Sequence, residues 1–333
     1  MNAFSPSAEL PFISVVLPTF NEAAYIEDCL RTLLDDPYPR DRLEVFVVDG
    51  GSTDGTREIV ARLRGEFPFL RLLDNPKRLQ GPAFNLAYQA ADRRAAWIVR
   101  CDAHARYPQG FLTRCIAACQ TRGADVVTYA DAPIGLGCFQ KAVAFAQNSP
   151  IGVGQSLYRL GTRSAFVDHG KHGAFLRATL DKGLLYDESF AINEDVELSH
   201  RIWQSGGKVW LEHELKVGYY PRHSLRGLIR QYYLYGRGRA RTLMKHGMTM
   251  KPRQGATIAL LAVNLASLVG GFFWAPLWLA LAAYLAAIAA GSVAGAVQRR
   301  DPCVLLAFVA LAAMHHAWPV GFIAERLAGR SRR

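Results

Sequence analysis

The stretch Val45–Val60, which reads VFVVDGGSTDGTREIV, decides the fold class. Its apolar residues run into an aspartate, a glycine pair and a Ser-Thr-Asp-Gly turn, and a helical pattern follows. This order predicts a buried parallel strand that ends in an acidic, glycine-rich loop. In open α/β sheets, ligands bind at the carboxyl ends of such strands. The stretch therefore predicts a nucleotide site.

The chemistry of this loop limits the class of ligand that it can bind. Asp49 can accept hydrogen bonds from a base or a ribose hydroxyl, whereas it would repel a phosphate unless a metal intervened. Gly50 and Gly51 allow positive φ and close approach of a ligand, and Ser52 begins ordinary helix-entry chemistry. We expect the loop to hold the nucleoside. The alternative is a plain strand-to-helix turn with an N-cap, since Asp-Gly turns are common.

Strand and helix patterns alternate through residues 12–130. Strands are expected at residues 13–17, 44–49, 70–73, 97–101 and 125–129, with helices between them. This alternation is typical of a doubly wound α/β domain. The following segment, residues 132–217, is less regular and rich in glycine, and we expect it to form the acceptor-facing half.

Two long apolar runs follow this region in the 333-residue chain. No Asp, Glu, Lys or Arg occurs in residues 254–298 or in residues 302–324. Because a bilayer crossing needs about 20 apolar residues, the first run fits two transmembrane helices and the second fits one. The alternative is a buried helical hairpin in a soluble protein.

The basic segment before the first run predicts a membrane protein with its globular part in the cytoplasm. Residues 215–253 contain ten Lys or Arg and no acidic residue, as expected beside the cytoplasmic face of a membrane. Apolar residues recur there at helical spacing, which predicts an interfacial amphipathic helix; a basic helix packed on the core is the alternative. No nucleic-acid motif accompanies the basic residues, so we expect no nucleic-acid partner.

Two further patterns agree with the cytoplasmic placement. Residues 1–11 are short and polar or broken by proline, and do not form a hydrophobic signal peptide. The six cysteines show no CxxC pair and no zinc-finger spacing. We expect them to be reduced thiols, mainly in the core.

The third apolar segment either spans the membrane or is re-entrant. If it spans, the arginine-rich tail after Ala324 lies outside, against the positive-inside rule. His315, His316 and Pro319 near its middle favour a shallow or broken helix. We therefore expect a cytoplasmic tail. The expected regions are a globular α/β domain at 12–220, a basic interfacial segment at 221–253 and membrane helices at 254–325, and the sequence specifies no oligomeric state.

A second chemical signal follows the fourth expected strand. Asp102 and His104 lie two residues apart, so both side chains leave the same face of an extended chain. A carboxylate and an imidazole placed in this way can share a divalent cation, which would neutralise a diphosphate. The position after a buried strand, in register with Asp49, supports this interpretation.

A third signal is the acidic pair Glu194 and Asp195. The apolar residues that follow predict a helix packed into the fold, with the pair at its start. The helix dipole favours ionised carboxylates there, so capping is one interpretation. The other is a general base directed into the cleft.

These motifs, taken in order, resemble a known family. Pro18–Glu22 (PTFNE), Val47–Thr56 (VVDGGSTDGT), the Asp102 motif and the Glu194–Asp195 pair look like those of inverting family 2 glycosyltransferases with the GT-A fold. Further segments are similar to those of bacterial succinoglycan-type exopolysaccharide glucosyltransferases, which extend a sugar linked to polyprenyl diphosphate. These segments are Asp102–Pro108 (DAHARYP), His172–Arg177 (HGAFLR) and Gly236–Thr242 (GRGRART).

The resemblance implies roles for individual residues. Asp195 would be the catalytic base, with Glu194 beside it at the acceptor. Asp102 and His104 would bind Mg²⁺ or Mn²⁺ on the diphosphate of a UDP-sugar, most simply UDP-glucose. The donor nucleotide would lie against a larger set, namely Pro18, Thr19, Glu22, Asp49, Gly51, Ser52, Arg78, Gly81 and Asp102. His172 and Gly173 would approach the sugars.

Two departures from the family refine these expectations. Most relatives have Asp where this chain has His104, and a nitrogen ligand favours Mn²⁺ over Mg²⁺. Processive synthases carry Gln-x-x-Arg-Trp, whereas Gln231 is followed here by Tyr-Tyr-Leu-Tyr. A processive polysaccharide synthase is therefore the second choice, and an inactive membrane scaffold the third. A nicotinamide oxidoreductase is disfavoured because the turn after the first strand lacks G-x-G-x-x-G.

Overall fold

The computed structural model describes residues 9–154, 157–171 and 173–330, and the chain divides into two compact units. The first unit contains the residues up to Ala132 together with Gly161–Tyr219. The second contains Pro133–Leu160 and Tyr220–Arg333. The sequence placed residues 133–160 in the globular α/β domain, whereas the structure groups them with the C-terminal helices.

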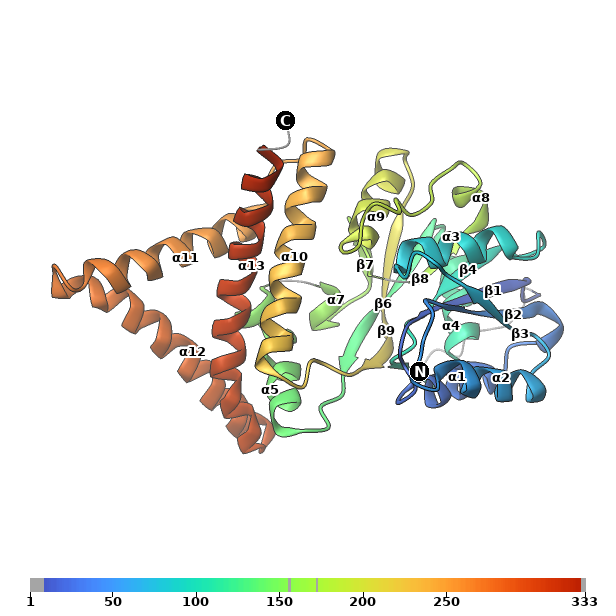
Figure 1. The fold of residues 1–333 in the computed structure, drawn as a ribbon, viewed down its shortest axis with the longest axis horizontal. Coiled ribbons are helices and arrows are strands. Elements are labelled where there is room, and N and C mark those ends of the chain that lie inside the picture. Colours follow the sequence, from blue (N-terminus) through green and yellow to red (C-terminus); the bar gives the residue numbers. More distant parts are fainter. Residues whose placement is uncertain (1–8, 155–156, 172, 331–333) are drawn as a thin grey trace. The chain divides into compact units, whose positions relative to one another are not determined.

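The first unit is a nine-stranded mixed sheet with helices on both faces (Figure 1). The strands are β1 (Ile13–Thr19), β2 (Leu43–Asp49), β3 (Leu70–Asp74), β4 (Trp97–Arg100), β5 (Ala105–Arg106), β6 (Val126–Pro133), β7 (Ala165–Val167), β8 (Gly173–Leu176) and β9 (Val209–Tyr219). The helices are α1 (Ile26–Leu34), the 3-10 turn η1 (Arg40–Arg42), α2 (Thr56–Glu66), α3 (Gln80–Ala90), α4 (Phe111–Arg122), α8 (Arg177–Leu180) and α9 (Glu194–Gln204). The strand order is β3-β2-β1-β4-β8-β6-β9-β5, and β7 pairs with β9.

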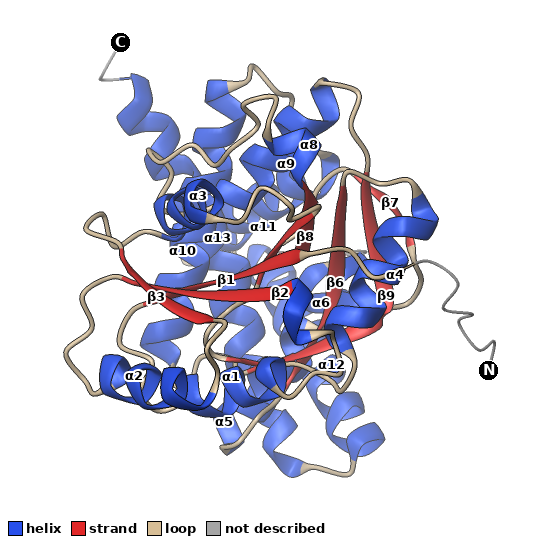
Figure 2. Ribbon diagram, turned by 90° about the vertical axis from the view of Figure 1, so that its right-hand side faces the viewer, coloured by secondary structure: helices blue, strands red, loops and turns tan. Residues whose placement is uncertain are grey.

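Alternation along the parallel strands distributes their side chains between two cores. Val15 and Leu17 of β1 pack with α1 and α2, whereas Val16 packs with α3. Figure 2 shows α1 and α2 on one face of β1–β3 and α3 on the other. The register pairs Thr19 with Asp49, so β1 and β2 end at the same edge of the sheet. This edge carries the first candidate site residues.

The alternation of strands and helices predicted for residues 12–130 is confirmed, since the expected strands are present as β1, β2, β3, β4 and β6. Beyond β4 the sheet is mixed, because β8 pairs antiparallel with both β4 and β6. A glycine is needed where β8 begins. A Cβ on Gly173 would lie 1.9 Å from the Val127 carbonyl oxygen, which no side chain tolerates.

The secondary-structure elements that lie wholly within the described part of the second unit are all helical. Its elements are α5 (Cys138–Gln147), α6 (Pro150–Val153), α7 (Leu157–Leu160), α10 (Leu225–Lys245), α11 (Pro252–Gly270), the 3-10 turn η2 (Ala275–Leu277), α12 (Trp278–Arg299), the 3-10 turn η3 (Pro302–Leu306) and α13 (Ala307–Arg330). α10 begins with a capped turn, in which the Ser224 hydroxyl accepts a hydrogen bond from the Gly227 N–H. A helix is therefore present over the predicted basic segment as α10, and its place at a membrane interface stays a prediction.

α10 and α13 lie side by side with almost no space between their backbones (Figure 1). A Cβ on Gly321 of α13 would lie 1.9 Å from the Tyr233 carbonyl oxygen of α10. Further along both helices, the Arg237 guanidinium bonds the Glu325 carboxylate at 2.6 Å. Contacts advance together along both sequences, so the helices run parallel. The basic helix is thus attached to the last apolar helix over much of its length.

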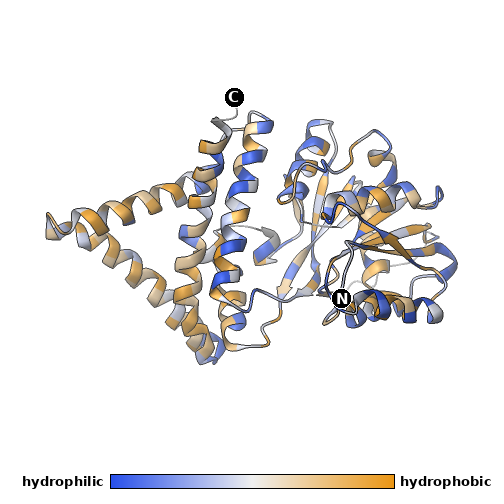
Figure 3. Cartoon of the chain, in the orientation of Figure 1, coloured by the Kyte–Doolittle hydropathy of each residue, from blue (hydrophilic) through white to orange (hydrophobic). Residues whose placement is uncertain are grey.

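α11 and α12 consist mainly of hydrophobic residues (Figure 3), and many of their side chains are exposed. Phe272 and Phe273, between α11 and α12, are 78% and 88% exposed. Two helices of the described part of the chain are long and apolar enough to cross a membrane, Ala275–Arg299 and Pro302–Gly329. The sequence expected residues 254–298 to supply two such helices, but α11 is not one of them. Only 11% of the apolar window of the first helix is buried, which does not fit a buried soluble hairpin.

One expectation about the cysteines is wrong. Cys138 of α5 and Cys303 of η3 form a disulfide, although 165 residues separate them in sequence. Their spacing gave no sign of this pairing because helix packing alone brings them together. Lys141 and Asp301 join the same two elements through an ion pair at 2.9 Å, so the contact does not depend on oxidation alone. The free cysteines are buried, as predicted: Cys29, Cys101, Cys115 and Cys119.

Candidate functional site

Asp49 organises the loop after β2. Its carboxylate accepts hydrogen bonds from the N–H groups of Gly51 and Ser52, each at 3.0 Å, and from the Arg57 guanidinium at 2.9 Å. Burial raises the pKa of Asp49, but the hydrogen bonds from Ser52 and Arg57 outweigh burial and hold this pKa below its usual value. The side chain has no exposed surface. A nucleoside would reach this carboxylate only by displacing one of its present donors.

Hydrogen bonds join the loop after β1 to the loop after β2. The Asn21 N–H donates to the Ser52 hydroxyl at 2.8 Å, and the Glu22 N–H donates to the Thr56 hydroxyl at 2.9 Å. Asp54 accepts a hydrogen bond from the Thr56 N–H, although the N-cap of α2 is Gly55, so the helix has no side-chain cap. The two loops therefore form one edge that carries both the Asp49 motif and Glu22.

Arg78 lies against this edge from the loop after β3. Its guanidinium sits 5.7 Å from the centre of the Phe20 ring and within 3.7 Å of the space that a side chain on Gly51 would occupy. The backbone of Arg78 is left-handed, with φ of 56°. Gly51 is required for its own positive φ of 82°, and the Arg78 guanidinium lies beside the acidic loop, where a diphosphate could meet it.

Three further predicted donor residues lie in or beside the sheet edge. Pro18 and Thr19 are the last residues of β1, and the Thr19 hydroxyl donates to the Leu17 carbonyl oxygen at 3.0 Å. Gly81 lies in the first turn of α3, where a Cβ would approach the Tyr186 side chain at 3.2 Å. Gly81 thus has a packing role in the structure, and its contact with the donor stays a prediction.

His104 and Glu22 form a pair that the sequence did not predict. The His104 Nδ1 lies 3.0 Å from the Glu22 carboxylate, and 37% of the imidazole side chain is exposed. Burial disfavours the imidazolium, but Glu22 and Asp102 outweigh this effect and raise the pKa of His104. Glu22, expected in the nucleoside pocket, therefore holds the imidazole of the predicted metal site.

The residues around His104 fit a divalent cation that substrate completes. Imidazoles that bind metals commonly donate their second N–H to a carboxylate, and Glu22 occupies that position on Nδ1, which leaves Nε2 for a metal. Asp102 supplies a carboxylate two residues away. Among the described residues, no group of three His, Cys, Asp or Glu side chains could hold a metal. Diphosphate oxygens would complete the coordination, as is usual for Mg²⁺ and Mn²⁺.

The acidic pair at the start of α9 divides into two different environments. The Glu194 carboxylate bonds the Arg100 guanidinium at 3.0 Å, and both side chains are buried. Arg100, the last residue of β4, also donates to the Gln80 side-chain oxygen and lies 5.0 Å from the centre of the Tyr186 ring. Glu194 therefore neutralises a buried arginine, and a contact with the acceptor remains a prediction.

Asp195 differs from its neighbour because no described ion pair fixes it. Its Oδ1 accepts a hydrogen bond from the Val196 N–H at 2.7 Å, and the residue is half-buried. Burial, together with the adjacent charge of Glu194, raises the pKa of Asp195 to about 7. A carboxylate with this pKa can exchange a proton near neutral pH, which is the property a general base requires.

Sequence reasoning missed Arg100, Gln80 and Tyr186 as parts of this site. One signal was available, since a charged residue that closes the apolar strand WIVR must find a buried partner. The choice of Glu194, 94 residues later, was not readable from spacing. His172 lies outside the described residues.

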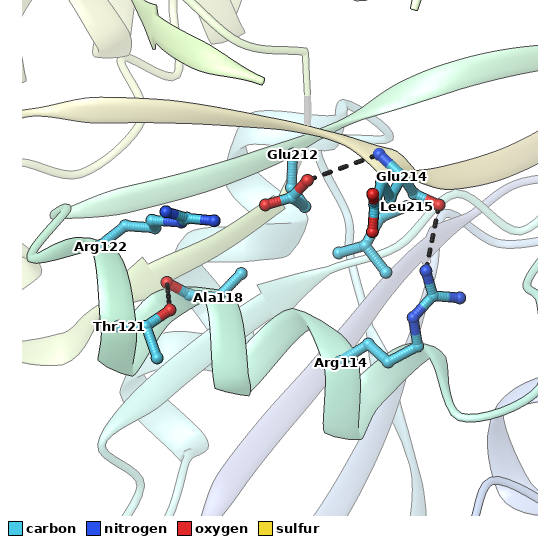
Figure 4. A pocket seen from close by; sticks show the side chains of 7 residues that line it. All are labelled: Arg114, Ala118, Thr121, Arg122, Glu212, Glu214 and Leu215. Atoms are coloured by element: carbon cyan, nitrogen blue, oxygen red, sulfur yellow. Dashed lines mark hydrogen bonds between the residues drawn. The ribbon is translucent and has the colours of Figure 1, made fainter. Parts of the chain in front are cut away.

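A small polar pocket between α4 and β9 is separate from these residues (Figure 4). The Arg114 guanidinium closes one end by donating to the Glu214 carbonyl oxygen at 3.2 Å. Arg122 and Glu212 line the other end. No residue predicted to bind donor, metal or acceptor lines this pocket, so it does not enter the site.

The fold and these motifs define a class of enzyme. The model of Glycosyl transferase family 2 matches residues 14–183. The chain belongs to this family and is a glycosyltransferase. It is similar to the succinoglycan biosynthesis protein ExoA of Rhizobium meliloti (strain 1021), with 39% identity over 319 residues that cover 96% of each chain.

Solved structures show the same fold at lower identity. A mannosyltransferase from Pyrobaculum calidifontis, in complex with GDP-Man and Mn²⁺, has a TM-score of 0.60 and 22% identity, covering 97% of this chain and 88% of its own. S. aureus TarS 1–349, in complex with UDP-GlcNAc, has a TM-score of 0.52 and 18% identity, covering 95% and 92%. The predicted GT-A-like α/β fold with apolar C-terminal helices is thereby confirmed.

Proposed function

We propose that this glycosyltransferase is an inverting enzyme of exopolysaccharide biosynthesis. It transfers a sugar, in the first instance glucose from UDP-glucose, to a saccharide linked to polyprenyl diphosphate at the inner membrane. The observation that carries the proposal is Asp195, a half-buried carboxyl with a pKa of about 7 at the start of α9. The similarity to ExoA supports the exopolysaccharide pathway.

The mechanism is a single displacement. Asp195 accepts the proton of an acceptor hydroxyl, whose oxygen attacks the anomeric carbon of the donor. The bond from that carbon to the diphosphate oxygen breaks, and its electron pair leaves with UDP. Attack from the opposite face inverts the anomeric configuration. A divalent cation held by Asp102 and His104 would supply charge stabilisation for the diphosphate.

The pH dependence of transfer is expected to report the charge of Glu194. Because the base must be ionised, wild-type kcat should fall as pH decreases below about 7. Glu194→Gln removes a negative charge beside Asp195, so the pKa of Asp195 should fall and the acid limb should move to lower pH. A kcat profile from pH 5 to 9 measures this shift. An unmoved acid limb would show that Asp195 does not control it.

Metal preference is expected to depend on His104. Wild-type activity should be higher with Mn²⁺ than with Mg²⁺ at equal millimolar concentration, because Mn²⁺ tolerates a nitrogen ligand better. His104→Asp should shift preference towards Mg²⁺, and His104→Ala should weaken activation by both metals. Activity titrations with each metal measure these changes. Metal dependence that survives His104→Ala unchanged would remove His104 from the site.

One assay separates the proposal from its alternatives. Membranes containing the protein are supplied with a panel of UDP-sugars and a labelled lipid-linked acceptor. Extension by one sugar supports the proposal, whereas a ladder of long products would indicate a processive synthase. Absence of UDP binding would indicate the inactive scaffold, and transfer with another sugar would correct the donor.

The proposed location rests on the second unit. Its exposed apolar helices need a lipid phase, and the basic helix α10 fits the cytoplasmic surface of the inner membrane. The catalytic unit would then face the cytoplasm, where UDP-sugars are made available to it. Membrane lipid is thus a third partner beside donor and acceptor.

A further inference from the structure

A groove of about 550 Å³ runs along the seam between α10 and α13, wholly within the second unit. Arg226, Ile229 and Arg230 line it from one face of α10, since these residues recur at helical spacing. Ala313 and Ala317 line it from α13 at the same spacing. The groove therefore has cations on one wall and small apolar residues on the other.

The two arginines of the groove are available to a ligand. Arg226 and Arg230 are exposed and lie about 6 Å apart along the helix axis, or roughly one turn. No ion pair joins either of them to an acidic residue of the described chain, in contrast to Arg237 of the same helix, which bonds Glu325. Two neighbouring guanidinium groups are suited to phosphate oxygens, which they can bind in a bidentate manner.

The α13 wall of the groove offers no competing polar group, whereas Tyr233 adds a phenol to the α10 wall beside the arginines. His316 is the polar residue of its α13 wall, and both of its ring nitrogens have partners. Nδ1 lies 2.8 Å from the Ala312 carbonyl oxygen, and Nε2 lies 3.1 Å from the Asn264 amide nitrogen. With both nitrogens engaged, the wall presents mainly carbon to an occupant. An occupant of this wall should be hydrocarbon.

The surface beyond the groove continues this apolar character. Asn264, which bonds His316, belongs to α11, and its neighbours Val263 and Leu265 are 48% and 52% exposed. A chain that leaves the groove over His316 would meet this apolar helix. The occupant is therefore an amphiphile with an anionic head and an extended apolar tail.

We propose that this groove binds the polyprenyl diphosphate of the acceptor, with the diphosphate at Arg226 and Arg230 and the first isoprene units against Ala313 and Ala317. The assignment rests on the proposed function for the choice of a diphosphate lipid. The charge of its head group favours a polyprenyl diphosphate over a phospholipid with a single negative charge, because two guanidinium groups match the two phosphates of one diphosphate.

A direct binding experiment tests the groove without any catalytic step. Purified full-length protein in detergent is titrated with farnesyl diphosphate, inorganic diphosphate or farnesol. Farnesyl diphosphate should bind at least tenfold more tightly than either fragment, since it supplies head and tail together. Arg226→Gln/Arg230→Gln should weaken its binding at least tenfold and leave farnesol binding unchanged. The matched control Arg222→Gln removes an exposed cation outside the groove and should bind like wild type.

A steric variant makes the test independent of charge. Ala313→Leu fills the apolar wall, so it should weaken farnesyl diphosphate and farnesol alike while binding of inorganic diphosphate persists. Thermal unfolding of each variant within a few degrees of wild type confirms that the unit is folded. Equal losses in Arg222→Gln, or full displacement of farnesyl diphosphate by an equal amount of phosphatidylglycerol, would overturn the proposal in favour of a general lipid contact.

Kinetics separate failure of the groove from failure of the proposed function. If both hold, Arg226→Gln/Arg230→Gln raises the KM for the lipid-linked acceptor at least tenfold, with the KM for UDP-sugar within twofold of wild type. Wild type that binds farnesyl diphosphate but transfers no sugar would contradict the proposed function and leave the groove standing. Transfer with an unchanged acceptor KM in the variant would contradict the groove alone.

Discussion

Replacement of Asp195 by asparagine is expected to lower sugar transfer by at least about 100-fold, because a general base typically contributes about 10²- to 10⁴-fold. Asparagine keeps the shape of the side chain but cannot accept the proton of the acceptor hydroxyl. UDP affinity should stay within about twofold of wild type, since the proposed mechanism gives this carboxylate no contact with the nucleotide. Initial rates of transfer and UDP titrations measure the two quantities.

Stability provides the control for this variant. The folded-state pKa of Asp195 is raised above its unfolded value, so the contribution of this carboxyl to stability is present in acid and is lost as pH rises through about 7. Asp195→Asn should therefore unfold at the same or a higher temperature than wild type at pH 8. The exposed Asp41→Asn should leave transfer unchanged. Retained turnover in Asp195→Asn would exclude Asp195 as the base.

Removal of Arg100 is expected to cost about 3–5 kcal/mol of stability, because it leaves the Glu194 carboxylate buried without its partner. Arg100→Met keeps a long side chain but removes the guanidinium, which also serves Gln80. The unfolding midpoint of the first unit should fall. Since the pair lies at the start of α9, beside Asp195, transfer should fall as well.

A second substitution separates lost charge balance from lost packing. Arg100→Met/Glu194→Gln removes both charges, so it should recover much of the stability lost in Arg100→Met. The matched control is Arg62→Met, which breaks the exposed ion pair with Glu27 and should leave the midpoint unchanged. If the double variant were no more stable than Arg100→Met, the buried pair would not explain the loss.

The sequence predicted the parts of this molecule that depend on local pattern. Alternating apolar residues identified the parallel strands, and the Asp49 loop was placed correctly at a carboxyl edge because β2 and its glycine pair are neighbours in sequence. The basic helix α10 could be predicted from the sequence for the same reason, since its apolar residues recur at helical spacing. Local periodicity is enough to fix elements of this kind.

The features that the sequence did not predict depend on contacts between residues that are distant in the chain. Nothing in the spacing joined Arg100 to Glu194, His104 to Glu22 or Cys138 to Cys303, although each pair shapes its surroundings. Burial of a charge or a thiol demands a partner but does not say where in the chain that partner lies. Candidate residues could thus be named from the sequence, whereas their present partners required the structure.

The close parallel contact of α10 with α13 has a consequence for how the protein sits in its membrane. Six Lys or Arg side chains occur along α10, and each would cost about 2.5–3.5 kcal/mol at the bilayer centre. If α13 crossed the membrane, the charged helix α10 that packs against it would have to cross as well. In the proposed location, the pair of α10 and α13 would instead lie along the cytoplasmic surface of the membrane, and protein covers 39% of the apolar window of α13. Because α11 is not apolar enough to cross, α11 and α12 would enter the bilayer as a re-entrant pair with Phe272 and Phe273 at its tip, and the proposed location would leave the end of α13 on the cytoplasmic side.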